Sequence, residues 1–256
     1  MKTGMRFSSL VMLASLFLSP AQATAAPTVE ELLNKTDDLM RGESSRGTMR
    51  MHVRTERWER ELVMSVLSKG EDRTLVQILS PAKEKGTATL KVDKNIWNYL
   101  PKVDRTIKVP ASMMSGAWMG SHLTNDDLVK DSRFVNHYDC EYTQLPDESN
   151  SRENSQHYVI SCIPKPEAPV VWGEVILTIR AQDEIIDRVQ FFDERKQLVR
   201  SIVYTDIIDV GDKKIPRRIQ VIPADKPDEI TEVIYEEIEF DVEIPDRMFS
   251  LQALRR

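Results

Sequence analysis

Histidines, cysteines and carboxylates are the residues of this chain that could do chemistry, and their spacing gives catalysis little support. The sequence contains no Gly-x-Ser-x-Gly elbow, no His-Glu-x-x-His motif and no glycine-rich phosphate loop. His122 stands near Asp126 and Asp127, but aspartates in the first turn of a helix favour the helix dipole and need no metal. We therefore predict that the protein is not an enzyme and holds no metal and no cofactor. The histidines are isolated from one another: His52, His122, His137 and His157.

The apolar side chains suggest a different chemistry, the binding of an apolar ligand. Segment 112–128 mixes three methionines and a tryptophan with glycines, and it shows neither helical period nor strand alternation. Eleven methionines is a high count for this length, and methionine suits adaptable apolar surfaces. We expect a cavity closed by this segment as a lid that is mobile over residues 113–123, where we predict few backbone hydrogen bonds, and a packed core is the competing interpretation. The predicted cavity and lid residues are Met49, Met51, Val53, Leu62, Met64, Val66, Trp97, Tyr99, Met113, Met114, Trp118, Met119 and Leu123.

The N-terminus has the pattern of a secretory signal peptide. Lys2 and Arg6 precede an apolar run that ends at Leu18, and small residues follow at cleavage spacing. The run is too short for a membrane anchor, which is the alternative interpretation. We predict a signal peptide over residues 1–25 and a single soluble, periplasmic domain over residues 26–256.

The charge of the exported chain excludes one class of partner. Without Lys2 and Arg6, 33 of the 35 basic residues remain against 41 acidic ones, a formal charge of −8. Such a chain has no electrostatic footprint for nucleic acid. By the same reasoning, we expect no basic patch that would hold the protein on an anionic membrane.

The two cysteines suggest a disulfide. Cys140 and Cys162 lie in consecutive strand-like segments, 134–145 and 156–164, that a polar loop separates. Because an exported chain meets an oxidising compartment and a hairpin would bring the two residues together, we predict that they are bonded. Two buried free thiols are the alternative, and the scattered histidines make a metal site with these cysteines unfavourable.

The elements that would position these residues are mostly strands. Residues 28–41 predict an amphipathic helix, with Thr28 and Glu31 at capping-box spacing. A second, short helix is predicted from Thr124, with Asp127 three residues on. Elsewhere the period is two, and turn signals recur every 8–12 residues or so, as in a barrel or sandwich. Turns are expected at 69–71, 93–95, 181–183, 193–196 and 211–212.

Residues 96–130 resemble the signature of the outer-membrane lipoprotein-sorting (LolA-like) family. Its members have a strand that ends in Trp-x-Tyr-Leu-Pro, then a basic turn, Phe-Met-Gly and a Thr-x-x-Asp-Leu helix start. Trp118 stands where phenylalanine is usual, and Asn125 where an aromatic residue is common. Flanking similarity extends over nearly all of the exported chain. The matching residues are Trp97, Tyr99, Leu100, Pro101, Arg105, Met119, Gly120, Thr124, Asp127 and Leu128.

The resemblance implies a mainly β fold, an open antiparallel half-barrel of about ten or eleven strands with short helices covering its concave apolar face. It implies a periplasmic carrier that binds lipid or the acyl chains of lipoproteins in that cavity and shuttles them between membranes or to a transporter. The related alternative is an accessory subunit of an inner-membrane RND-type exporter that carries nothing itself.

Overall fold

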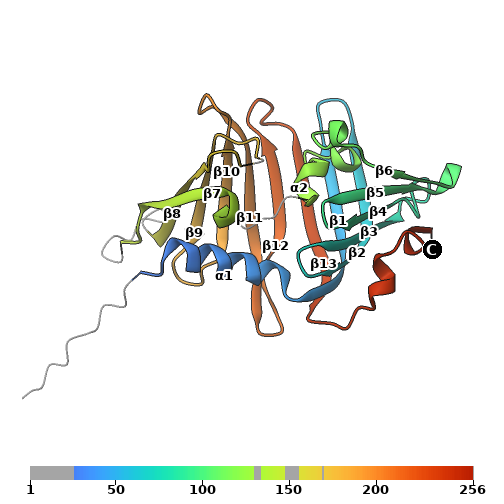
Figure 1. Cartoon of the computed structure of the whole chain (residues 1–256), viewed down its shortest axis with the longest axis horizontal. Coiled ribbons are helices and arrows are strands. Elements are labelled where there is room, and N and C mark those ends of the chain that lie inside the picture. Colours follow the sequence, from blue (N-terminus) through green and yellow to red (C-terminus); the bar gives the residue numbers. More distant parts are fainter. Residues whose placement is uncertain (1–25, 130–133, 148–155, 169, 256) are drawn as a thin grey trace, which may run out of the picture.

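The computed structural model describes residues 26–129, 134–147, 156–168 and 170–255, so the predicted signal peptide lies outside the described residues. The described residues form an antiparallel sheet of thirteen strands (Figure 1). The strands are β1 (Ser44–Arg54), β2 (Glu59–Lys69), β3 (Arg73–Ser80), β4 (Ala88–Val92), β5 (Asn95–Leu100), β6 (Arg105–Lys108), β7 (Tyr138–Gln144), β8 (His157–Pro164), β9 (Glu174–Arg180), β10 (Ile186–Phe192), β11 (Leu198–Val210), β12 (Lys213–Pro223) and β13 (Ile230–Phe240).

The sheet is open, with β6 at one edge and β7 at the other. Its strand order is β6-β5-β4-β3-β2-β1-β13-β12-β11-β10-β9-β8-β7. Neighbouring strands are therefore consecutive in the chain everywhere except at the β1–β13 pair. That pair joins the strands that precede segment 112–128 to the strands that follow it.

The predicted fold class and turns are confirmed, while the number of strands is higher than the ten or eleven expected. Each of the five predicted turn sites joins two consecutive strands. One missed strand is β6, which has only four residues and therefore shows too little alternation to be separated from the preceding strand.

Helix α1 (Val29–Arg41) begins and ends as its sequence predicts. The Thr28 hydroxyl accepts a hydrogen bond from the backbone N–H of Glu31, whose side chain accepts one from the backbone of Thr28 in return. Gly42 ends the helix with a φ of 62°, a positive value that glycine adopts at little cost. The helix buries Leu32 and Leu33 and lies across one face of the sheet, as Figure 1 shows.

The face under α1, which we call the inner face, carries two apolar clusters. The first contains residues of β7 to β12 packed against α1 and against α3 (Phe134–His137). The second contains residues of β1, β2, β3 and β13 packed against Trp118. Leu123 and Ile219 contact both clusters and so connect them.

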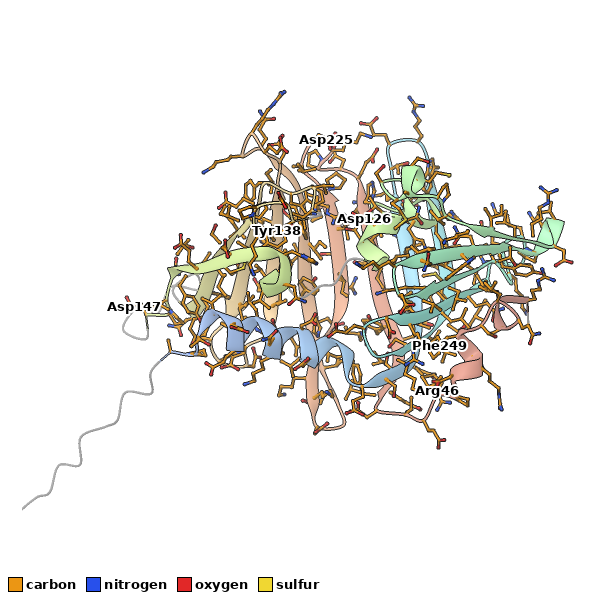
Figure 2. The ribbon with its side chains drawn as sticks, viewed as in Figure 1. Arg46, Asp126, Tyr138, Asp147, Asp225 and Phe249 are labelled. Atoms are coloured by element: carbon orange, nitrogen blue, oxygen red, sulfur yellow. A yellow bond between two sulfur atoms is a disulfide. The ribbon has the colours of Figure 1, made fainter. Side chains whose placement is uncertain are left out.

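The opposite, outer face carries a third cluster, under the C-terminal segment. Leu75 and Leu90 of the sheet pack there against Phe249 and Leu254, which belong to the 3₁₀ turns η5 (Asp246–Phe249) and η6 (Ala253–Arg255). Figure 2 shows Tyr138 of the first cluster and Phe249 of the third in opposite halves of the molecule. Each half of the sheet thus has its own covering segments.

The predicted disulfide joins Cys140 and Cys162, which face each other across β7 and β8. Their Cα atoms are 4.1 Å apart. The bond ties the edge strand β7 to its neighbour. Among the described residues, no helix has the length and apolar character needed to cross a membrane.

Candidate ligand-binding site

A cavity of about 390 Å³ lies on the inner face, between the sheet and the segments that cover it. Its volume falls in the range of roughly 300–1,000 Å³ that is usual for small-ligand sites. Most of its lining is apolar or aromatic. The lining residues are Leu33, Thr36, Asp37, Leu123, Asp127, Phe134, His137, Tyr138, Val170, Trp172, Ile186, Val189, Phe191, Arg200, Ile202, Tyr204, Ile219 and Tyr235.

Arg200 of β11 is the cation in the wall of this cavity, and it is only 6% exposed. Its two terminal nitrogens donate to the two carboxylate oxygens of Asp127, over 2.8 and 2.6 Å. Its guanidinium carbon also lies 4.9 Å from the ring centre of Trp172 and 4.6 Å from that of Phe191. The bidentate pair and the two aromatic faces offset the cost of burying a charge.

Arg200 also has a donor at Nε. Its Nε–H is buried and has no hydrogen-bond partner among the described residues. Because a buried donor without a partner is costly, it is a place where a ligand acceptor would gain free energy. The cavity therefore combines a mostly apolar lining with a buried cation that has an unpaired donor.

Asp127 connects this arginine to helix α2 (Asn125–Val129). The Asp127 carboxylate accepts hydrogen bonds from the backbone N–H and the hydroxyl of Thr124, which completes the predicted capping box. Burial by itself would raise the pKa of Asp127, but the bonds from Arg200 and Thr124 outweigh it and hold that pKa below its usual value. The carboxylate is therefore ionised at neutral pH and closes one side of the cavity.

Two phenols of the cavity stay neutral. Burial raises the pKa of Tyr138 and of Tyr204 to about 12. Neutral hydroxyls donate and accept hydrogen bonds without adding charge. The ionic groups that the cavity presents are thus confined to a few positions in a mostly apolar wall.

Segment 112–128 is more ordered by hydrogen bonds than the sequence suggested. The backbone N–H of Trp118 donates to the carbonyl of Leu123 at 2.7 Å, and the N–H of Asn125 donates to the carbonyl of Gly116 at 3.0 Å. Trp118 is buried, and its indole N–H donates to Thr89 of β4. The expectation of few backbone hydrogen bonds was wrong, because two 3₁₀ turns, η2 (Ala111–Met113) and η3 (Trp118–Gly120), replace the helix that the glycines interrupt.

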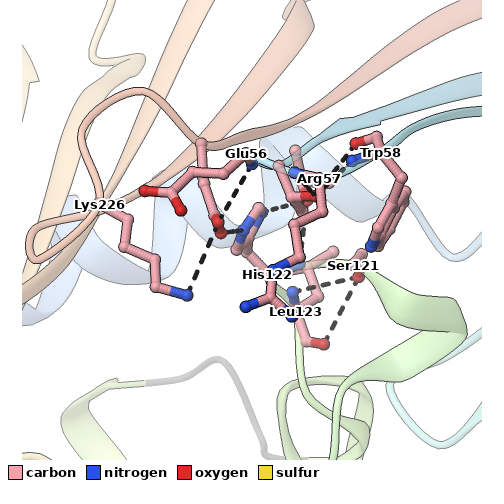
Figure 3. A network of polar contacts seen from close by, with 10 residues as sticks. Glu56, Arg57, Trp58, Ser121, His122, Leu123 and Lys226 are labelled. Carbon is pink, nitrogen blue, oxygen red and sulfur yellow. Dashed lines mark hydrogen bonds and ion pairs between the residues drawn. The ribbon is translucent and has the colours of Figure 1, made fainter.

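His122 anchors this segment to the start of β13 (Figure 3). Its backbone N–H donates to the hydroxyl of Thr231, which lies 2.8 Å from the imidazole Nδ1, while Nε2 lies 3.0 Å from a carboxylate oxygen of Glu229. A neutral imidazole with its proton on Nε2 satisfies both contacts. His122 therefore contacts Glu229 rather than the aspartates beside it in the sequence. No cluster of three potential metal-ligating side chains occurs in the described part of the chain.

Most of the predicted cavity residues lie in the second inner cluster, away from the cavity. The set is almost fully buried, and its neighbours Val66 and Met119 are partly buried at its margin. Of all the predicted residues, Leu123 lines the 390 Å³ cavity. Whether the others contact a ligand stays a prediction. The clustered residues are Met49, Met51, Val53, Leu62, Met64 and Trp118.

Trp97 and Tyr99 lie on the other side of the sheet. The register pairs Trp97 with Leu90 and Tyr99 with Ala88, and all four belong to the outer cluster under the C-terminal segment. Met113 is 59% exposed, and Met114 is half-buried. The structure thus divides the predicted set between two faces.

The residues that sequence reasoning missed come from the three helices, from Val170 and Trp172, and from strands β7 and β10 to β13. The sequence did carry a sign of this site at Arg200. Arg200 is two residues before Ile202 and four before Tyr204, so it lies on the same inward, apolar face of β11. A charged residue at an inward position of a strand needs a buried partner. That partner, Asp127, lies 73 residues earlier in the chain, so spacing could not reveal it.

A second depression, of about 470 Å³, lies on the outer face beside the C-terminal segment. Leu67 and Met248 contribute apolar surface, but Arg46, Glu237 and Glu239 form a charged margin. Arg46 and Glu239 pair with each other at 2.8 Å on an exposed surface. Although this depression is larger, it lacks a buried polar anchor, so we favour the inner cavity as the ligand site.

Comparison with known proteins places the chain in a family. A family model described as “-like: Uncharacterized protein” matches residues 70–256, which is more than half of the chain. The chain belongs to this family. A search among curated proteins finds no match.

Solved structures show that the fold of this family member is LolA-like. A DUF1329 family protein from Desulfovibrio piger has a TM-score of 0.77 at 18% identity, with 88% of this chain and 97% of that one covered. A putative outer membrane lipoprotein-sorting protein domain from Vibrio parahaemolyticus has a TM-score of 0.74 at 20% sequence identity, and the match covers 89% of this chain and 98% of that one. A LolA superfamily protein from Nitrosomonas europaea has a TM-score of 0.70 at 23% sequence identity, and the match covers 89% of this chain and 100% of that one.

Proposed function

We propose that this protein is a non-enzymatic carrier that binds an acyl chain in the cavity on the inner face of its sheet. The observation that carries the proposal is the cavity itself, an apolar space of about 390 Å³ with Arg200 in its wall. The apolar lining suits a hydrocarbon chain. The Nε–H of Arg200 suits an acceptor group such as an ester or carboxylate oxygen.

The physical driving force is sufficient. Burial of a methylene contributes about 0.8 kcal/mol, so ten methylenes give about 8 kcal/mol before the costs of ordering. An apolar cavity of this kind is a liability when it is open to water. The pair between Asp127 and Arg200 fastens α2 to β11 at the cavity wall, and its opening would admit the ligand.

The proposed setting is the periplasm, after removal of residues 1–25. The name of the Vibrio structure, a putative lipoprotein-sorting domain, supports a cargo of lipid or acylated lipoprotein. The cargo would pass to a membrane or to a transporter, and an RND-type transporter is the partner that the sequence resemblance implies.

A substitution that fills the cavity tests the proposed carrier function. Ile219 lines it and is partly buried, so Ile219→Trp places an indole in the space that an acyl chain would occupy. We expect this variant to bind a fluorescent fatty acid at least about tenfold more weakly, a change of ~1.4 kcal/mol. Native mass spectrometry of the wild type, purified without detergent, should detect bound lipid.

Val203→Trp is the matched control. Val203 precedes Tyr204 on β11 and therefore faces the outer side of the sheet, so the same added group should leave binding unchanged. Equal loss in both variants would indicate a general disturbance of the fold. Wild-type protein that carries no lipid and binds no fatty acid would refute the carrier.

A further inference from the structure

The charge of this acidic chain is unevenly distributed. Residues 81–108 contain seven basic and three acidic side chains, although the whole chain has a formal charge of −6. The other residues therefore carry a net charge of −10. The expectation that no basic patch exists, drawn from total charge, does not hold for this part of the chain.

Two turns bring most of these cations to one margin of the sheet. The β3–β4 turn touches the β5–β6 hairpin, since a Cβ built on Gly86 would lie 3.6 Å from Pro101. The tip of the hairpin is the 3₁₀ turn η1 (Pro101–Val103). We call the exposed cations of these two turns and of β6 the basic rim: Lys83, Lys85, Lys102, Arg105 and Lys108.

The acidic residues of the same turns are too few to neutralise these cations. Glu84 is mostly buried and pairs with Arg60, a further cation, and its other carboxylate oxygen lies 3.8 Å from the Nζ of Lys83, so its one negative charge is shared by two cations. Asp104 accepts a hydrogen bond from the Tyr99 hydroxyl at 3.2 Å and remains exposed. The rim therefore presents a net positive surface to anything that approaches the hairpin.

Aliphatic side chains stand among these cations. Leu100 is 38% exposed, Ile107 is 47% exposed and Val103, at the tip, is 60% exposed. Figure 1 shows the β5–β6 hairpin projecting beyond the rest of the sheet, at the right of the view. The strand β6 is the edge of the sheet, so the hairpin has no strand beyond it.

We propose that the basic rim docks the protein on an anionic phospholipid bilayer, with Val103 entering the interface. Cations around an exposed aliphatic tip match anionic headgroups above an apolar layer. A protein partner fits less well, because interfaces between proteins are poor in lysine and favour aromatic anchors. At physiological salt the acidic remainder of the molecule, beyond a Debye length of about 8 Å, is screened from the bilayer.

This docking goes beyond the carrier function and does not require it. The exported form, residues 26–256, is mixed with vesicles of phosphatidylcholine alone or with about one-third phosphatidylglycerol, and bound protein is measured by co-sedimentation. We expect binding to the anionic vesicles at about 0.15 M NaCl, where the Debye length is about 8 Å, and its loss at about 0.5 M NaCl, where the Debye length is about 4 Å.

Charge reversal tests the rim itself. A basic side chain near an anionic surface strengthens binding roughly fivefold, so Lys102→Glu with Arg105→Glu should weaken it by at least tenfold. The control reverses Arg195 and Lys196 together, in the exposed β10–β11 turn, with the same change of net charge. It should bind within about twofold of wild type, as screening predicts. Thermal melts verify that all variants are folded.

Insertion of the tip has its own readout. A tryptophan in Val103→Trp should shift its fluorescence to the blue on anionic vesicles and not on phosphatidylcholine. Absence of binding to anionic vesicles would overturn the proposal, even if the protein then bound an acidic membrane protein. Equal loss in the rim and control variants would also overturn it, because net charge and not the rim would then control binding.

Discussion

At the scale of single residues, Arg200 is the feature that distinguishes this sheet from a purely apolar one. A guanidinium on an inward position of β11 would be costly by itself. Asp127, Trp172 and Phe191 surround it and offset that cost. Because the pair spans α2 and β11, it also holds the covering segment against the cavity.

We predict that Asp127→Asn leaves Arg200 buried without its counter-charge and lowers the free energy of unfolding by about 3 kcal/mol at pH 7. The folded pKa of Asp127 lies below its ordinary value of 3.8, so its stabilisation is complete above that pH and is lost as pH falls through the lowered pKa. Urea unfolding of both proteins should therefore give a constant difference from pH 5 to pH 8, which shrinks below about pH 4.

Asp225→Asn, in the exposed β12–β13 turn, serves as the control and should change stability by less than about 0.5 kcal/mol. A double variant, Asp127→Asn with Arg200→Met, should recover part of the loss, since an apolar replacement of a buried pair is often neutral. A double variant that loses the sum of both single effects would contradict the coupling of this pair.

At the scale of elements, the inner face has two clusters with different properties. The cluster over β7 to β12 leaves the cavity open beside α1, α3 and Trp172. The cluster over β1 to β3 is closed by Trp118 and leaves Met51 and Met64 without exposed surface. Methionine fills the closed cluster as an adaptable apolar side chain.

For the closed cluster, we predict that Met64→Gln lowers the free energy of unfolding by about 3 kcal/mol, because its amide finds no partner there. Binding of a fatty acid to the folded variant should stay unchanged, since Met64 does not line the cavity. Ser65→Gln, one residue along β2 on the other face, should have little effect on either quantity. Normal stability with binding weakened tenfold would instead mean that Met64 contacts the ligand, as the sequence predicted.

At the scale of the whole molecule, the β1–β13 pair holds the two parts of the sheet together. Every other ladder in the sheet joins strands that are consecutive in the chain. Gly47 lies in this pair, where a Cβ would be 2.4 Å from the carbonyl oxygen of Glu237. The close approach of the two backbones accordingly depends on a residue without a side chain.

We predict that Gly47→Ala forces these strands apart and costs about 2 kcal/mol. Hydrogen exchange should become faster in both β1 and β13, because the disturbed ladder belongs to both strands. Thr48→Ala, the next residue, should leave the exchange pattern of β13 unchanged. Exchange that speeds up only at residue 47 and its immediate neighbours would show that the pair tolerates the added methyl group.

Features that depend on neighbours in the chain could be predicted from the sequence alone. The capping boxes at Thr28 and Thr124 follow from hydrogen bonds between residues three apart. The hairpin turns and the disulfide between Cys140 and Cys162 follow from alternation with a short loop between. Interactions of this range have few competing arrangements, so local pattern is enough to predict them.

Which apolar face surrounds a cavity, and which face is closed, could be seen only in the folded protein. Trp97 and Met64 are both apolar residues of alternating strands, so the sequence does not distinguish their faces. The strand register places them on opposite faces of the sheet, and a shift of one residue would exchange the faces of a strand. Arg200 meets Asp127 only after β11 has been placed beneath α2. Burial, cavity volume and charge pairing depend on distances between residues far apart in the chain, and those distances are fixed only when the whole sheet has formed.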